Sequence, residues 1–90
     1  MPSIELTVKH KVGLHARPAS QFVKLAGSYP CDLQVRNLST GSDPVNAKSI
    51  LSVLTLGVNC DHQIEVTASG DQADEALAAI TDLVESNFGE

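Results

Sequence analysis

The sequence has little aromatic content, few basic residues and no long hydrophobic run. Aromatic residues make up 3% of the 90 residues and tryptophan is absent, so a core must be built from aliphatic side chains. Six basic residues against eleven acidic ones give a net charge of −5, which excludes a broad basic face for nucleic acid. No segment approaches the length of a membrane span, and no apolar signal region follows Met1. We therefore expect one soluble domain over residues 1–90, without membrane insertion.

Cysteine is also scarce. Cys31 and Cys60 stand far apart without CxxC or metal-ligand spacing, so we expect free thiols in a reducing cytoplasm. His10 lies between two lysines at the edge of a loop, and His62 lies in a polar turn. A metal site built on His10 and His15 would lack further ligands at suitable spacing. The sequence therefore predicts no metal and no cofactor.

Hydrophobic periodicity predicts four strands and three helices. Apolar and polar residues alternate near residues 4–8, 32–36, 45 and 64–68, which is typical of strands with one buried face. Helical spacing begins after His15 and ends at Gly27, returns briefly at residues 49–56, and returns again after Asp71, the expected N-cap of the last helix.

The order β-α-β-β-α-β-α predicts an α+β fold. We expect an open-faced β-sandwich, in which a four-stranded antiparallel sheet carries three helices on one face. If the first helix is a crossover, the first two strands run parallel and need a strand between them. The fourth strand fits that place.

Residues 13–18 read Gly-Leu-His-Ala-Arg-Pro and place a lone histidine at the entrance to the first helix. Pro18 is tolerated in a first helical turn, because the amide that it lacks would have no intrahelical partner. The amides of Ala16 and Arg17 are unpaired for the same reason and lie at the positive end of the helix. Such a helix start binds phosphate well. His15 is therefore predicted to become phosphorylated, with simple capping of the helix as the alternative.

The short helix at residues 49–56 has more apolar residues than one buried stripe can hold. Leu51 and Leu54, spaced i to i+3, are expected either to share an exposed edge or to be covered by a loop. Ser49 begins this helix, and its hydroxyl is expected to accept a hydrogen bond from the amide of Ser52. A phosphate on Ser49 would also be favoured by the helix dipole.

The two motifs together resemble a known family. Gly-Leu-His-Ala-Arg-Pro-Ala at 13–19 and Val-Asn-Ala-Lys-Ser-Ile-Leu at 45–51, followed by Leu56 and Gly57, are similar to the two signatures of the HPr family, the phosphocarriers of the bacterial phosphotransferase system. The resemblance covers nearly the whole chain. It implies a cytoplasmic, monomeric carrier that is not catalytic alone. Such a carrier takes a phosphoryl group from enzyme I and passes it to enzyme IIA domains for sugar uptake.

The resemblance also implies roles for individual residues. His15 would accept the phosphoryl group on Nδ1, the amides of Ala16 and Arg17 would bind its oxygens, and the Arg17 guanidinium would stabilise it. Ser49 would be a regulatory phosphorylation site, with HPr kinase/phosphorylase and a transcriptional regulator as further partners. The positions that would bind partners are Ser20, Lys24, Leu51 and Leu54.

The segment at residues 38–44 departs from the family pattern. This connection is about three residues longer than the compact turn expected between two such strands. Because it leads toward Ser49, it bears on recognition by the kinase. Three alternatives stay open: a regulatory module that acts mainly through Ser49, a branch of the system not dedicated to sugar transport, and a small enzyme that hydrolyses acyl phosphates without enzyme I.

Overall fold

A single antiparallel sheet organises the chain. The computed structural model describes residues 2–11 and 13–89. Its strands pair in the order β1-β4-β2-β3, and every pairing is antiparallel. β4 therefore lies between β1 and β2, as predicted. The bounds of the strands are β1 (Ser3–Thr7), β2 (Asp32–Asn37), β3 (Val45–Asn46) and β4 (Gln63–Ser69).

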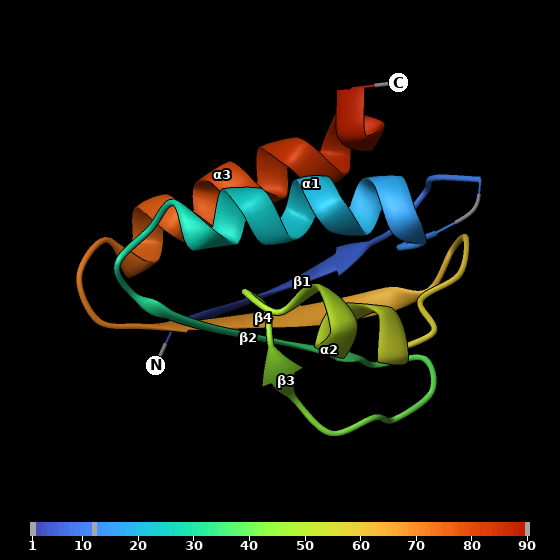
Figure 1. The fold of residues 1–90 in the computed structure, drawn as a ribbon, viewed down its shortest axis with the longest axis horizontal. Helices are drawn as coiled ribbons and strands as arrows, with labels where there is room; N and C mark the ends of the chain where they lie inside the picture. Colours follow the sequence, from blue (N-terminus) through green and yellow to red (C-terminus); the bar gives the residue numbers. More distant parts are fainter. Residues whose placement is uncertain (1, 12, 90) are drawn as a thin grey trace.

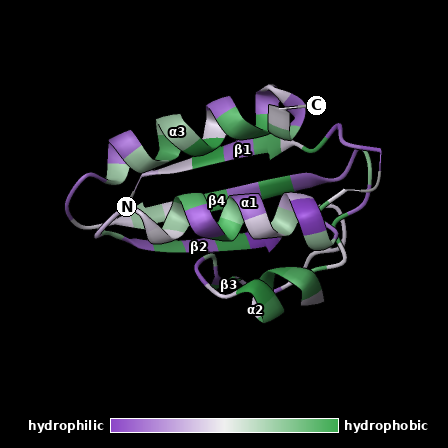
Figure 2. Ribbon diagram, turned by 45° about the horizontal axis from the view of Figure 1, so that its top comes forward, coloured by the Kyte–Doolittle hydropathy of each residue, from purple (hydrophilic) through white to green (hydrophobic). Residues whose placement is uncertain are grey.

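Three helices complete the fold of the residues that the structure describes. α1 (Ala16–Gly27) and α3 (Ala73–Glu85) lie side by side over the sheet, and a short 3₁₀ turn, η1 (Asn87–Gly89), follows α3 (Figure 1). The shorter α2 (Ile50–Thr55) packs against α1 and β3, on the side of α1 away from α3 (Figure 2). The predicted α+β open-faced sandwich and its order of elements are confirmed.

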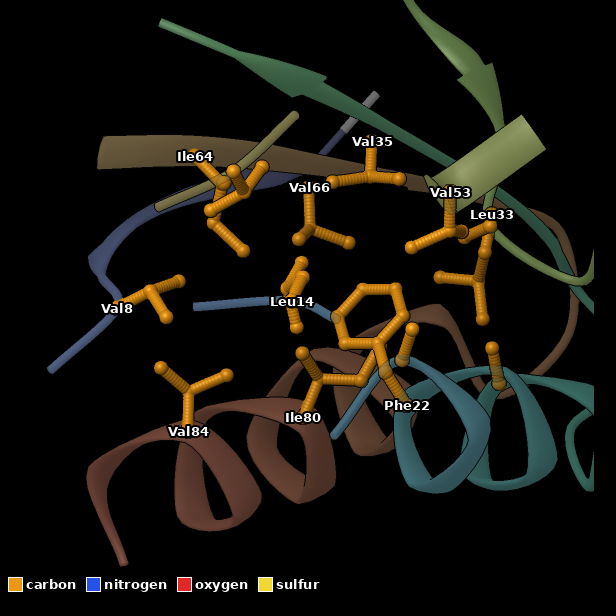
Figure 3. Close-up of a cluster of buried hydrophobic side chains, with 14 of the residues drawn as sticks. Val8, Leu14, Phe22, Leu33, Val35, Val53, Ile64, Val66, Ile80 and Val84 are labelled. Atoms are coloured by element: carbon orange, nitrogen blue, oxygen red, sulfur yellow. The ribbon is translucent and has the colours of Figure 1, made fainter. Parts of the chain in front are cut away.

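The alternation of the strands explains why only one face of the sheet is covered. Leu33 and Val35 of β2 pair with Ala68 and Val66 of β4, and these side chains are buried on the helical side. The sheet, the helices and the loops between them all contribute side chains to the core. Figure 3 labels Val8, Leu14, Phe22, Leu33, Val35, Val53, Ile64, Val66, Ile80 and Val84. Because α2 contributes Val53, all three helices belong to one core.

The start of α3 corrects one prediction. Gln72, with φ 64°, is the N-cap residue in place of Asp71, and its side chain makes no capping hydrogen bond. The left-handed backbone at Gln72 moves Asp71 one residue outside the capping position. Asp74 and Glu75 do lie in the first turn, as predicted. Their negative charges interact favourably there with the positive end of the helix dipole.

His10 lies in the loop that follows β1, as predicted. The residue is only 9% exposed, and its ring packs edge-on against Phe88, with 5.9 Å between the ring centroids. Cys31 is buried and Cys60 is exposed, and both are free thiols, as predicted. Within residues 2–11 and 13–89, no helix is long and apolar enough to cross a membrane. The same residues contain no cluster of His, Cys, Asp or Glu that could hold a metal ion.

Candidate functional site

His15 occupies the N-cap position of α1. Its backbone is extended, with φ −85° and ψ −168°, and its carbonyl accepts from the amide of Ala19 at 2.8 Å. The imidazole makes no capping hydrogen bond to its own helix, and the residue is exposed. The ring is therefore not used as a helix cap, and the simple capping alternative for His15 is ruled out.

The first turn of α1 leaves two amides for a ligand. Pro18 has no amide hydrogen, and the amide of Ala19 is already bonded to His15. The amides of Ala16 and Arg17 thus lie at the start of the helix without intrahelical acceptors. Pro18 and Ala19 are buried and fix the turn, whereas Ala16 and Arg17 are exposed beside the imidazole. An anion bound here would meet backbone donors and a guanidinium.

An open hollow adjoins the imidazole. Its lining residues are Lys11, His15, Asn59 and Cys60. Two segments far apart in the sequence therefore meet at this end of the molecule, the loop that leads into α1 and the turn that leads into β4. Both loops lie at the same end in Figure 1.

Gly13 allows these two segments to approach closely. It has φ 65°, and a Cβ at this position would collide with Val58 O and lie 2.6 Å from Asn59 Cα. The amide of Leu14 donates to Val58 O at 2.9 Å. The backbone that precedes His15 is thus fixed against residues 58–59, and only glycine fits at position 13.

The start of α2 is built differently. Ser49 is the N-cap residue and its side chain accepts from the amide of Ser52 at 3.4 Å, as predicted. Ser49 is half-buried, and its carbonyl accepts from Val53 at 3.0 Å. The hydroxyl therefore already fulfils the capping role that the sequence predicts.

The exposed side of α2 is apolar. Leu51 is 74% exposed and Leu54 is 39% exposed, and Ile50 joins them at 37%. The prediction of an exposed leucine edge is confirmed, and the alternative that a loop covers these residues is wrong. Figure 2 shows α2 as an almost uniformly hydrophobic helix at the edge of the molecule. Such a surface is typical of a docking site for another protein.

Ser20 and Lys24 lie on α1 and are exposed. Together with Arg17 they follow the spacing i, i+3, i+7, which places them along one side of the helix. Because α1 packs against α2, this polar stripe and the leucines of α2 belong to neighbouring elements.

A buried polar network beside the site was not predicted. Asn37 is fully buried, and its Oδ1 accepts from the amides of Ser39 and Thr40 at 3.0 and 3.4 Å. Its Nδ2 lies 3.2 Å from Leu56 O and 3.1 Å from His62 Nδ1. The signal in the sequence is that Asn37 continues the inward-facing series of Leu33 and Val35, where a polar residue requires partners.

Residues 38–42 are held tightly by this network and by its neighbours. Ser42 donates its amide to Asn37 O at 3.1 Å and accepts the Asn37 amide on its hydroxyl at 2.9 Å. Ser39 Oγ accepts from the amide of Gln63 at 2.9 Å. The longer connection expected between β2 and β3 is therefore anchored to the sheet where it begins.

The fold and the site define a class of protein, the small open-faced α+β sandwich that presents a histidine at the N-terminus of its first long helix. Comparison with known proteins agrees. A family model described as "PTS HPr component phosphorylation site" matches residues 2–86. The chain belongs to this family, the HPr phosphocarriers of the phosphotransferase system.

Individual relatives cover the chain from end to end. The Phosphocarrier protein HPr of Pseudomonas aeruginosa is 40% identical over 93 aligned residues, which span 100% of this chain and 98% of the relative. The crystal structure of HPr-C-His from Thermoanaerobacter tengcongensis superposes with a TM-score of 0.94 at 40% identity, covering 100% and 98% of the two chains. An HPr dimer from the same organism matches with a TM-score of 0.77 at 40% identity and full coverage of both chains.

A longer relative shows a similar domain within a larger protein. The Multiphosphoryl transfer protein of Salmonella typhimurium is 36% identical over 88 residues, which span 98% of this chain and 23% of that protein.

Proposed function

We propose that this chain accepts a phosphoryl group on Nδ1 of His15 from phospho-enzyme I and passes it to enzyme IIA domains. In the first step the Nδ1 lone pair attacks phosphorus as the bond to the donor imidazole breaks, and the donor nitrogen keeps that bonding pair. The second step repeats this exchange with a partner histidine as the nucleophile. The observation that supports the proposal most directly is the exposed His15 ring, which makes no capping bond at the start of α1.

The surroundings of His15 suit this chemistry. Phosphoryl transfer requires in-line approach and stabilisation of charge on the equatorial oxygens. The amides of Ala16 and Arg17 and the Arg17 guanidinium supply donors beside the imidazole. His15 is exposed and borders an open hollow, which leaves room for the attacking or leaving histidine of a partner. The proposal needs no metal and no cofactor.

The surface for both partners would be the stripe of Ser20 and Lys24 on α1 together with Leu51 and Leu54 on α2. A carrier must dock first with its donor and then with its acceptor, so one surface would serve both in turn. The exposed leucines supply the apolar area, and the polar stripe on the neighbouring helix supplies contacts that fix orientation. Because transfer takes place between two docked proteins, the chain alone would turn over no substrate.

Ser49 is proposed as a second, regulatory site. Its hydroxyl is half-buried at the start of α2, two residues before Leu51, so a phosphate there would place negative charge at the edge of the apolar surface. An HPr kinase/phosphorylase would add and remove it, and a transcriptional regulator with a basic surface could then bind. This role fits a cytoplasmic protein that acts as a monomer.

Three alternatives make different predictions. A regulatory module would act mainly through Ser49, and a branch of the system not dedicated to sugar transport would use other acceptors after His15. A small enzyme would hydrolyse acyl phosphates without enzyme I. The test mixes the purified chain with enzyme I and phosphoenolpyruvate and then adds IIA domains. A carrier gains one acid-labile phosphate and loses it to a IIA domain. A module that acts through Ser49 gains none from enzyme I, and an acyl-phosphate hydrolase turns over substrate without it.

A further inference from the structure

The turn that faces His15 is fixed by a second histidine. Residues 59–62 form a tight turn in which the amide of His62 donates to Asn59 O at 3.0 Å. Asp61 adopts φ 69°, and its amide donates to Val8 O at 2.7 Å, while Val8 donates to His62 O at 2.9 Å. The His62 ring folds back over this turn, and the amide of Asn59 donates to its Nδ1 at 3.1 Å.

The tautomer of this ring follows from its neighbours. A backbone amide can only donate, so Nδ1 of His62 is the acceptor, and in the neutral ring the hydrogen is on Nε2. Asn37 agrees independently, because its Oδ1 accepts from two backbone amides and its Nδ2 must therefore face the ring, at 3.1 Å from Nδ1. A hydrogen on Nδ1 would point at two donors and break both contacts.

The turn also forms part of the hollow beside His15. Asn59 and Cys60 line that hollow together with His15. Directly before them, Val58 O accepts from the amide of Leu14, and Asn59 Cα lies against Gly13. A shift of residues 58–60 would therefore change both the wall of the hollow and the backbone that holds His15.

We propose that His62 is a positioning residue for phosphoryl transfer at His15, acting through the Asn37–His62–Asn59 network. The unprotonated Nδ1 of His62 fixes the Asn59 amide, and the turn then holds the loop that leads into α1. Asn37 extends the same network to Leu56 O, at the C-terminal end of α2. The inference rests on the proposed function of His15.

The contribution is expected in the transfer step and not in docking. The backbone hydrogen bonds between the turn and Val8 do not involve the His62 ring. A variant at position 62 should therefore keep the turn, but the position of Asn59 relative to His15 should no longer be fixed. The exposed leucines of α2, which are proposed to bind partners, are unaffected. The maximal rate of transfer from phospho-enzyme I should fall, whereas the KM for this chain should change little.

The test uses three variants and one spectroscopic measurement. His62→Leu fills space without an acceptor and should lower the maximal rate about two- to tenfold, the effect of one lost hydrogen bond. His62→Asn places an oxygen near the position of Nδ1 and should restore the wild-type rate. In His62→Gln the acceptor lies one bond further out, so the maximal rate of transfer should again be low. This variant replaces His62→Leu if the leucine variant does not fold. In wild-type protein, nuclear magnetic resonance should show a coupling across the hydrogen bond between the Asn59 amide nitrogen and His62 Nδ1.

Specific results would overturn the proposal. Wild-type rates in His62→Leu or His62→Gln, equal slowing in His62→Asn, or no Asn59–His62 coupling would each contradict it. Failure of the proposed function looks different, because the wild-type chain would then accept no phosphate from enzyme I while the coupling would still be measurable.

Discussion

Helices α1 and α2 begin in chemically different ways, although each start presents a side chain for which we propose phosphorylation. At α1 the His15 ring makes no capping bond, and two amides lie beside it without intrahelical acceptors. At α2 the Ser49 hydroxyl already accepts from the amide of Ser52. A phosphoryl group on His15 would thus gain donors without displacing a contact, whereas one on Ser49 would have to replace an existing cap. We therefore expect the start of α1 to accommodate a phosphoryl group with less rearrangement than the start of α2.

The largest expected change in stability comes from Gly13, whose backbone packs against residues 58–59 and holds the loop before His15. Gly13→Ala should destabilise the fold by about 3 kcal/mol or more, because the strain of a left-handed alanine adds to a collision with residues 58–59. Urea unfolding measures the change. Gly41→Ala is the matched control, since Gly41 has φ 72° but nothing within 4 Å of the added Cβ, and should cost only about 1–2 kcal/mol. Equal losses in the two variants would show that the close approach at Gly13 does not matter.

Arg17→Ala should lower the rate of phosphoryl transfer at α1 without changing the stability of the fold. Removing one charged donor from the phosphate is expected to slow transfer about tenfold to a hundredfold, measured with phospho-enzyme I in rapid-mixing experiments. The residue is exposed, so the melting temperature should change little. Arg36→Ala serves as control, because Arg36 pairs with Glu65 at 2.8 Å on the open face of the sheet. If both variants transfer at the same rate, Arg17 has no special role.

Leu51→Asp should weaken docking at α2 without unfolding the chain. The side chain is 74% exposed, and a carboxylate in its place would have to be desolvated against an apolar partner surface. We expect the Kd for enzyme I and for IIA domains to rise about tenfold or more, measured by calorimetry. Ala78→Asp adds the same charge at an exposed position on α3 and should bind normally. Loss of the folded state in Leu51→Asp would instead place this leucine in the core.

The smallest effects are expected at Ser49. Ser49→Ala removes a long capping bond and should cost about 1 kcal/mol or less, measured by thermal unfolding. Ser49→Asp keeps an acceptor at the cap, so its melting temperature should remain near that of the wild type. It should slow phosphorylation of His15 modestly, since aspartate has about half the charge of phosphoserine. Wild-type rates both in this variant and with authentic phosphoserine would reduce Ser49 to a helix cap.

Much of this fold follows from local patterns in the sequence. Alternation in β1, β2 and β4 and the helical spacing after His15 are properties of neighbouring residues, and the antiparallel order follows from the crossover at α1. The cap of α3 was missed because Gln72 adopts a left-handed backbone that its residue type does not indicate. The sequence left two alternatives for Leu51, an exposed position or one covered by a loop, because its exposure depends on what packs over α2.

The Asn37–His62 contact could not be predicted from local patterns in the sequence. These residues are separated by 25 positions, and the polar turn around His62 resembles an ordinary loop in sequence. Alternation along β2 indicates that Asn37 faces inward, but only the register of β2 against β4 places it opposite Ile64 and close to the turn. Interactions between side chains distant in sequence therefore require the assembled sheet before they can be identified.

The most direct measurement of the central claim is the mass and chemical stability of phosphate added by enzyme I and phosphoenolpyruvate. The wild-type chain should gain one phosphate that is labile in acid and stable in base, and Ser49→Ala should gain the same. His15→Ala should gain none while keeping its fold, because the imidazole is exposed and makes no capping bond. Undiminished labelling of His15→Ala would contradict the account, since the phosphoryl group would then reside elsewhere.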